Sequence, residues 1–243
     1  MASDVSTDAT AGPLPPAKAR RLALLHDKPR GRLLVHEIYR SVQGESTFAG
    51  LPCVFVRLAV CDARCHWCDT PHAFNQGELW SPDDVLERVQ SYGCPLVEIT
   101  GGEPLLQEEV FPLMTRLADG GLTLLLETSG LHPVDRVDSR VHIIMDLKCP
   151  DSGECEGNCW ANLDLLKPTD QVKCVIASRR DFDWAAATIR ERRLDRRFAV
   201  LLSPVFDAVR PVDLANWLLD SGLQVRMQLQ LHKYVWDPKA RGV

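Results

Sequence analysis

Short apolar runs alternate with polar, helix-like stretches along most of this chain, and no other feature constrains its fold as strongly. Eight runs are predicted as strands, at residues 33–39, 54–59, 96–100, 123–127, 142–147, 171–177, 198–202 and 224–228. Helical patterns lie between several of them, at 81–91, 107–117, 181–192 and 211–219. Such alternation implies right-handed βαβ units on a parallel sheet, so we predict an α/β fold that is either open and doubly wound or curved into a full or partial barrel.

Length and composition fit one large domain. A chain of 243 residues that is 45% hydrophobic and 25% charged can bury a sizeable core. Residues 1–32 differ, because they are rich in Ala, Pro, Ser, Asp and Arg and show no apolar period, so they cannot offset the entropy of ordering. We therefore predict a disordered tail over 1–32, whose deletion leaves turnover unchanged, and a single domain over 33–243.

Charge and hydropathy argue against two classes of function. The net charge is −5 without a long block of like charges, which argues against the basic surface of a nucleic-acid-binding protein. No stretch approaches the roughly 20 uninterrupted apolar residues of a membrane span, and the N-terminus has no secretory hydrophobic core. The sequence predicts a cytoplasmic protein that acts on a small molecule, without direct contact to nucleic acid or membrane.

Polar clusters follow four of the predicted strands. They are the cysteine loop 61–68 and the segments 100–103, 127–130 and 146–148. Because parallel strands end at the same edge of a sheet, we expect the four clusters to converge on one rim, where α/β barrels carry their chemistry.

The strongest chemical signal is the spacing of Cys61, Cys65 and Cys68, with three and then two residues between the thiols. The chain has nine cysteines, and three so close together without an export signal favour a metal site over a disulfide framework. Iron–sulfur clusters are usually held by four thiolates, so three ligands leave one iron open to a substrate or cofactor. Three alternatives remain open: neighbouring core cysteines, a redox thiol pair, and a zinc site completed by His66 or His72.

This cysteine loop, with Trp67 directly before the last cysteine, resembles that of the radical S-adenosylmethionine (SAM) superfamily. Residues 100–104, Thr-Gly-Gly-Glu-Pro, are similar to the GGEP motif of that superfamily, whose backbone contacts the methionyl amino group. The resemblance implies a partial (β/α)6-type TIM-like barrel, one [4Fe–4S] cluster per chain, and S-adenosylmethionine bound at the open iron. There an electron from the cluster breaks a carbon–sulfur bond to give a 5′-deoxyadenosyl radical.

Further segments resemble one family of that superfamily, the 7-carboxy-7-deazaguanine synthases of queuosine and deazapurine biosynthesis. The likeness runs from about residue 36 to 238. It begins with the Q-G-E loop at 43–45 and closes with the His-Lys-Tyr segment at 232–234. The resemblance implies a lyase that uses Mg²⁺ and converts 6-carboxy-5,6,7,8-tetrahydropterin to 7-carboxy-7-deazaguanine, with loss of ammonia.

The same resemblance assigns the site residues, none of them catalytic beyond the cofactor ligands. The metal ligands are Cys61, Cys65 and Cys68 for the cluster and Thr70 for Mg²⁺. The substrate residues are Val42, Gln43, Gly44, Glu45, Arg57, Thr100 and His232. The cofactor residues are Gly102, Glu103, Glu127, Thr128, Ser129, Asp146, Leu147, Lys148, Ser203, Pro204 and Val205. The Gln43 amide and the Glu45 carboxylate suit the pterin ring, and Arg57 and His232 are expected at its carboxylate.

Some features lie outside this assignment. Some relatives end at the proline after the His-Lys-Tyr segment, whereas here residues 239–243 follow Pro238, so the chain does not end where theirs does. Cys149, Cys155 and Cys159 share a loop; free thiols are the favoured interpretation there, and a second cluster or zinc site is the alternative. The sequence names no partner for His26, His36, His72, His132 and His142, which are expected to be surface or core residues.

Two other functions share part of the pattern. An activase that places a glycyl radical on a partner protein would need the cysteine loop but neither the Q-G-E loop nor the His-Lys-Tyr segment. A non-catalytic zinc-binding interaction protein would need the cysteines alone. The favoured function also predicts a pterin substrate, an electron donor such as flavodoxin, and a homodimer.

Overall fold

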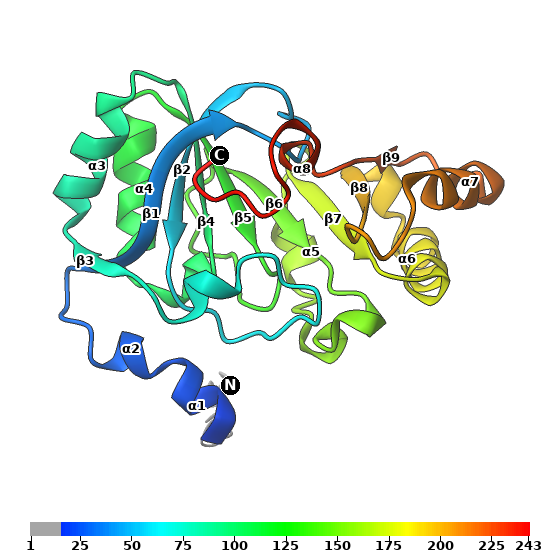
Figure 1. Cartoon of the computed structure of the whole chain (residues 1–243), viewed down its shortest axis with the longest axis horizontal. Coiled ribbons are helices and arrows are strands. Elements are labelled where there is room, and N and C mark those ends of the chain that lie inside the picture. The colour runs from blue at the N-terminus through cyan, green and yellow to red at the C-terminus, as the bar shows by residue number, and fades with distance from the viewer. Residues whose placement is uncertain (1–15) are drawn as a thin grey trace, which may run out of the picture.

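A curved sheet of nine strands, in the order β3-β1-β2-β4-β5-β6-β7-β8-β9, forms the centre of the protein (Figure 1). The structure, a computed structural model, describes residues 16–243, and residues 1–15 of the predicted tail lie outside the described residues. From β2 to β9 in this order, each strand pairs in parallel with the next. Strand β1 instead pairs antiparallel with both β2 and β3. The order ends at β3 and β9, so the sheet does not close, and the predicted partial barrel is confirmed.

The predicted strands and helices are present with shifted ends, and residues 16–243 also form one strand and four short α-helices that the sequence analysis did not predict. The strands are β1 (Leu33–Val42), β2 (Pro52–Leu58), β3 (Glu78–Trp80), β4 (Leu96–Gly101), β5 (Thr123–Thr128), β6 (His142–Asp146), β7 (Gln171–Ile176), β8 (Ala199–Pro204) and β9 (Arg226–Met227). The helices are α1 (Pro16–Arg21), α2 (Ala23–His26), α3 (Pro82–Ser91), α4 (Val110–Asp119), α5 (Asn162–Leu165), α6 (Arg179–Arg192), α7 (Pro211–Ser221) and α8 (His232–Val235). The sequence missed β3, a three-residue edge strand. Among residues 16–243, no helix has the length and apolar character needed to cross a membrane.

Local chemistry explains where the long helices begin. Ser81 caps α3, because its hydroxyl accepts from the Asp84 amide while the Asp84 carboxylate accepts from the Ser81 amide. Ser178 caps α6 in the same sense by accepting from the Asp181 amide, so this helix begins two residues before the predicted start. Helix α4 begins later than predicted, because Gln107 has an extended backbone (φ −108°, ψ 112°) at the end of a short 3-10 turn, and its buried side chain bonds the backbone of Leu34.

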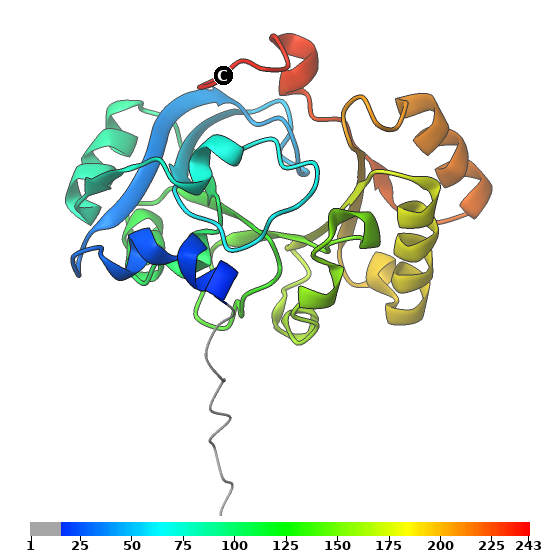
Figure 2. The same ribbon diagram turned by 60° about the horizontal axis from the view of Figure 1, so that its bottom comes forward.

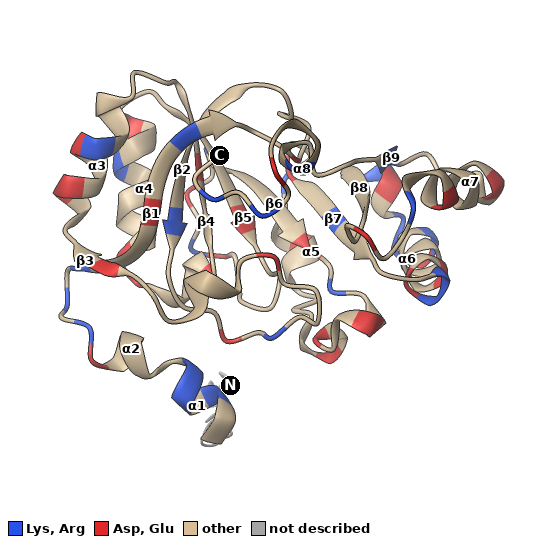
Figure 3. Ribbon diagram, in the orientation of Figure 1, with Lys and Arg blue, Asp and Glu red and all other residues tan. Residues whose placement is uncertain are grey.

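The two faces of the sheet differ in chemistry. The outer face supplies residues such as Val56, Ile99 and Met145 to the main apolar core, and α3, α4, α6 and α7 cover this face (Figures 1 and 2). The inner face carries a smaller apolar cluster that includes Phe55 and Leu125. Because side chains alternate along a strand, residues two positions further toward the carboxyl ends face the same interior. Figure 3 shows that the sheet carries both basic and acidic residues, among them those on β2, β5 and β7.

The predicted tail is too long at its C-terminal end. Helices α1 and α2 lie beside the loop that follows β2, which carries the cysteines (Figure 2). Lys18 Nζ lies 2.6 Å from Asp62 Oδ2, and Arg21 Nη1 donates to the Asp62 carbonyl at 2.6 Å. Asp62 is buried, so these contacts with the first residue after Cys61 connect the segment from residue 16 onward to the cysteine loop.

Two deletions separate the part of the tail outside the described residues from the part that contacts the cysteine loop. Removing residues 1–15 is expected to leave iron content and thermal stability unchanged. Removing residues 1–32 takes away the Lys18 and Arg21 contacts with Asp62. Since Lys18 is partly exposed, we expect a loss of about 1 kcal/mol, or roughly 2–4 °C in Tm, together with lower iron retention. Iron analysis and thermal unfolding of both proteins test this, and equal behaviour would show that the helices only rest on the loop.

Candidate active site

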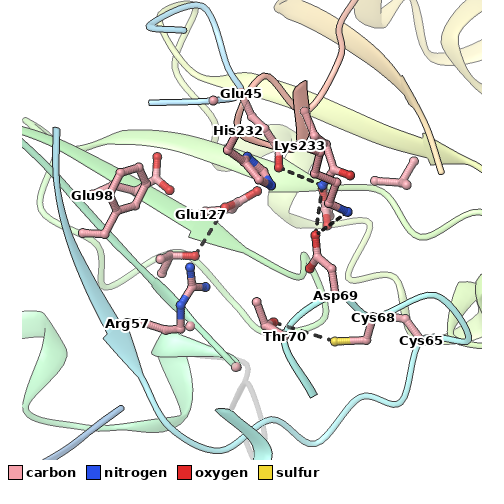
Figure 4. Close-up of a pocket in the computed structure, with 18 of the residues that line it drawn as sticks. Glu45, Arg57, Cys65, Cys68, Asp69, Thr70, Glu98, Glu127, His232 and Lys233 are labelled. Carbon is pink, nitrogen blue, oxygen red and sulfur yellow. Dashed lines mark hydrogen bonds and ion pairs between the residues drawn. The ribbon is translucent and has the colours of Figure 1, made fainter. Parts of the chain in front are cut away.

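A cavity of about 480 Å³ opens where the parallel strands end, and the four polar clusters meet in its wall. Its lining includes the three cysteines, Thr70 and all seven predicted substrate residues. Of the predicted cofactor residues it includes Gly102, Glu127, Thr128, Ser129, Asp146, Leu147, Lys148 and Val205. Glu103, Ser203 and Pro204 do not line it. Figure 4 shows Cys65, Cys68 and Thr70 on one side of this space, and Arg57, Glu98 and Glu127 on the other.

A strained turn directs the cysteine loop into the cavity. Val60, directly before Cys61, has φ of +75°, which is uncommon for a β-branched residue. Two backbone bonds hold it there, one from the Val60 amide to the Ala73 carbonyl at 2.7 Å and one from the Glu103 amide to the Val60 carbonyl at 2.9 Å. Further along, the His66 amide donates to the Ser152 carbonyl at 3.1 Å, so the loop after β6 supports the middle of the cysteine loop.

The spacing of the thiols fits a cluster better than a single zinc ion. A single metal ion needs several His, Cys, Asp or Glu ligand atoms close together. Among residues 16–243, only His36, Glu37 and His72 form a group of three whose ligand atoms all lie within 4.8 Å of one another. At least one pair of the three thiols therefore lies more than 4.8 Å apart, which is wider than the roughly 3.8 Å separation that follows from tetrahedral Zn–S bonds of about 2.3 Å. A cluster, in which each thiolate binds a different iron, accommodates wider spacing. Cys149, Cys155 and Cys159 form no such group either, and all nine cysteines are free thiols.

The glycines of the GGEP segment are required by the cysteine loop itself. Gly101 has φ of +142°, and a Cβ on it would lie 2.1 Å from the Leu58 carbonyl oxygen. A Cβ on Gly102 would lie 2.1 Å from the Val60 carbonyl oxygen. The end of β4 thus packs backbone against backbone on the turn that leads to Cys61.

Glu103 supports the site from behind. Its buried carboxylate accepts hydrogen bonds from the Thr128 hydroxyl, from the amide and hydroxyl of Ser129, and from the Leu105 amide. With its acceptors occupied by protein donors, this carboxylate holds the loop after β5 in place, so the cofactor contact predicted for Glu103 stays a prediction for its backbone.

The predicted substrate residues are held by one another. Arg57 donates from Nε to Glu37 at 2.8 Å and from Nη2 to the Tyr39 hydroxyl at 3.0 Å, which leaves its Nη1 side toward the cavity. The Gln43 amide group is engaged, because its Nε2 donates to Glu98 at 2.7 Å and its Oε1 accepts from the Glu45 amide at 2.7 Å. Gln43 therefore orients Glu98 and Glu45, instead of offering the free amide that the sequence predicts.

Lys173 lies at the centre of a charged network that the sequence did not identify. Its ammonium lies 2.9 Å from Glu45 and 3.4 Å from Asp146, and it also bonds Glu127. Lys148 pairs with the other oxygen of Asp146 at 2.7 Å. Burial alone would lower the pKa of Lys173, but Asp146, Glu127 and Glu45 outweigh it and raise that pKa.

The C-terminal segment covers the opposite side of the cavity. The His232 ring packs on Gly44, where an added Cβ would lie 2.6 Å from Nδ1. Gln230 donates to Glu45 at 3.1 Å and to Asp69 at 3.0 Å, which links this segment to the residue after Cys68. The residues after Pro238 also turn back to the cavity, whose lining includes Ala240, Arg241, Gly242 and Val243.

Several histidines have partners that the sequence could not name. His36 and His72 lie together with ring centroids 4.9 Å apart, and His72 lines the cavity. His132 Nε2 lies 3.1 Å from Asp62 Oδ1. A signal was available for Lys173 and Glu98, because each is a charged residue inside an otherwise apolar strand. None was available for Glu37, Asp69 and Gln230, whose neighbours in space are distant in sequence.

Comparisons with known proteins agree with this geometry. The family model of the radical SAM superfamily matches residues 56–150 of this chain. A 7-carboxy-7-deazaguanine synthase from Chlorobaculum tepidum is 49% identical over 214 residues, covering 87% of this chain and 97% of that protein. A 7-carboxy-7-deazaguanine synthase from Koribacter versatilis is 46% identical over 224 residues, covering 86% of this chain and 99% of that protein. The crystal structure of QueE from Escherichia coli superposes with a TM-score of 0.68 at 24% identity, covering 83% of this chain and 95% of that one, and so supports the fold.

Replacing Gly102 tests the contact between β4 and the cysteine loop. In Gly102→Ala the new methyl group would meet the Val60 carbonyl oxygen, so the turn must shift. Overpacking of this kind costs about 1–3 kcal/mol, and we expect Tm to fall by roughly 5 °C and iron content to fall by half or more. Gly120→Ala is the matched control, because an added Cβ on this exposed glycine at the end of α4 would meet no atom closer than 3.2 Å. Normal iron content in Gly102→Ala would contradict the assignment.

Proposed function

Because this chain belongs to the 7-carboxy-7-deazaguanine synthase family of radical SAM enzymes, we propose that it converts 6-carboxy-5,6,7,8-tetrahydropterin to 7-carboxy-7-deazaguanine with loss of ammonia. The enzyme is a radical SAM lyase and uses a [4Fe–4S] cluster and S-adenosylmethionine. When bound, these two groups would supply a carbon-centred radical able to abstract hydrogen from the substrate.

The residues in the cavity fit these groups. Cys61, Cys65 and Cys68 would hold the cluster, because all three line one cavity and at least one pair of their thiols lies more than 4.8 Å apart, too far for one ion. Thr70 lies beside them, with its hydroxyl 3.8 Å from the Cys68 sulfur, and would supply an oxygen to Mg²⁺. Gly102 and the residues that end β5 and β6 would contact S-adenosylmethionine. Thr128, Ser129, Asp146, Leu147 and Lys148 lie in that part of the lining, and Val205 follows β8.

The single observation that carries the substrate proposal is the half of the cavity opposite the cysteines. Arg57 presents a guanidinium edge there, with Glu37 and Tyr39 fixing its orientation, and the His232 ring lies over Gly44. A guanidinium binds a carboxylate in two parallel bonds, so this side suits the 6-carboxylate of the pterin. Glu45 and Thr100 line the space between and offer acceptors and donors to the ring.

We propose four further properties that the comparisons leave open. The radical chemistry requires a one-electron donor, for which a flavodoxin is suited. A homodimer stays a prediction, as does a single catalytic domain, to which the segment from residue 16 onward is added because Lys18 and Arg21 contact Asp62. For Glu127 we propose a position on the substrate side, because its carboxylate bonds Lys173 and Thr100.

The decisive assay uses protein purified and reconstituted under anaerobic conditions. It is incubated with dithionite, S-adenosylmethionine, Mg²⁺ and 6-carboxytetrahydropterin, and the product is followed by mass. We expect 7-carboxy-7-deazaguanine from the native chain and none from Cys65→Ala, which lacks one cluster ligand. Formation of 5′-deoxyadenosine without this product would leave the radical chemistry intact and refute the proposed substrate.

Arg57→Ala tests the carboxylate half of the cavity. Loss of one charge-assisted pair is expected to raise KM for the pterin about tenfold or more, with a smaller effect on kcat. Arg40→Ala is the control, since this exposed arginine on β1 does not line the cavity. Equal KM values for the two variants would remove Arg57 from the substrate site.

A further inference from the structure

Glu98 occupies an apolar position on the inner face of the sheet. Its neighbours in register are Phe55 on β2 and Leu125 on β5, and both belong to the inner apolar cluster. Only 2% of Glu98 is exposed, yet it lines the cavity (Figure 4). A carboxyl group therefore stands at the boundary between the apolar floor and the charged layer above it.

The cavity contains more acids than the nearby cations can neutralise. Two acids of the lining, Glu37 and Asp69, pair with Arg57 and Lys233. The other four carboxyl groups, those of Glu45, Glu98, Glu127 and Asp146, share the two ammonium groups of Lys148 and Lys173. Lys173 contacts three of these carboxylates, and Lys148 shares Asp146. Among residues 16–243, Glu98 alone of the four has no ion pair. A buried carboxylate without a cation is costly, so Glu98 is the acid that keeps its proton.

One hydrogen bond determines which oxygen carries that proton. The Gln43 side chain cannot turn over, because its Oε1 accepts from the Glu45 amide. Its Nε2 therefore donates to Glu98 Oε2, at 2.7 Å. The proton is left for Oε1, and no hydrogen bond from the part of the chain that the structure describes reaches that oxygen.

We propose that Glu98 is a neutral carboxylic acid whose Oε1–H donates a hydrogen bond to a ring nitrogen or carbonyl oxygen on the fused pyrimidinone of the substrate. The neutral state follows from the protein alone, whereas the acceptor rests on the proposed function. Burial raises the pKa of Glu98 to about 8, and the nearby Glu127 carboxylate adds to the increase. Other titratable or charged groups around it are Tyr39 on β1, Cys53 and Arg57 on β2, Lys173 on β7 and Glu45 in the loop after β1.

The neutral state is tested on the cluster-loaded enzyme without substrate. In the unfolded chain Glu98 loses its proton near pH 4.5, whereas in the folded protein it does so near pH 8. The folded state therefore binds more protons between these values, and its stability falls as pH rises through this window. Glu98→Gln lacks this loss, so its Tm relative to the native enzyme is expected to increase by roughly 5 °C or more from pH 5 to 8 and to level off above.

Glu87→Gln, an exposed carboxyl of α3, is the matched control and should show no such rise. A Tm difference between Glu98→Gln and the native enzyme that does not change with pH would overturn the neutral assignment.

The hydrogen bond to substrate is tested by KM for the pterin. Glutamine keeps a neutral donor of the same shape, so Glu98→Gln should stay within about threefold of the native KM, whereas Glu98→Leu should raise it about tenfold. The native KM should also rise above pH 8, while that of Glu98→Gln stays level. A Gln variant as impaired as the Leu variant would show that the anion is required. If the native enzyme makes no product from the pterin, the proposed function and the acceptor fail together, and the Tm series still decides the neutral state.

Discussion

The contact between the end of β4 and the turn after β2 is the constraint on which the rest of the site depends. Gly101 and Gly102 lie against the backbone of Leu58 and Val60, where a single Cβ would collide. The following residues extend this contact in two directions. Glu103 bonds the loop after β5, and Gln107 bonds the backbone of Leu34 and Ala59. One short segment therefore positions the cysteine loop, the cofactor side of the cavity and the first strand relative to one another.

A second constraint is electrostatic. The inner face of an open parallel sheet is shielded from water on most sides, so charges there must be paired or neutralised. Arg57 with Glu37, and Lys173 with Glu45, Glu127 and Asp146, meet this condition through direct contacts. These pairs form a rigid polar layer above Phe55 and Leu125, and a substrate that enters exchanges its water for donors and acceptors already in position.

Much of the fold could be predicted because its signals are local. The apolar runs predict the parallel strands, and a helix is predicted from residue 81, where Ser81 caps α3 and Pro82 is its first residue. The antiparallel edge strand β3 has three residues and no apolar period, so nothing in its own sequence distinguishes it from a loop. The helices before β1 were missed for a different reason. These helices are held by contacts with Asp62, which lies more than forty residues further along the chain. Composition cannot reveal contacts between residues so far apart in sequence.

The site divides in the same way. Residues that follow strands could be placed at the rim, since parallel strands end together, and the cysteine spacing identified a cluster loop. The sequence could not show which side chains point at ligands and which hold other side chains. Gln43 and Glu103 look like ligand contacts in a linear motif, yet protein groups occupy their hydrogen bonds. Glu98 and Lys173 look like interruptions of apolar strands, yet both reach the cavity. In a barrel interior, a charged residue where alternation predicts an apolar one is therefore as informative as a motif, because its burial is tolerated only where a partner or a ligand compensates for it.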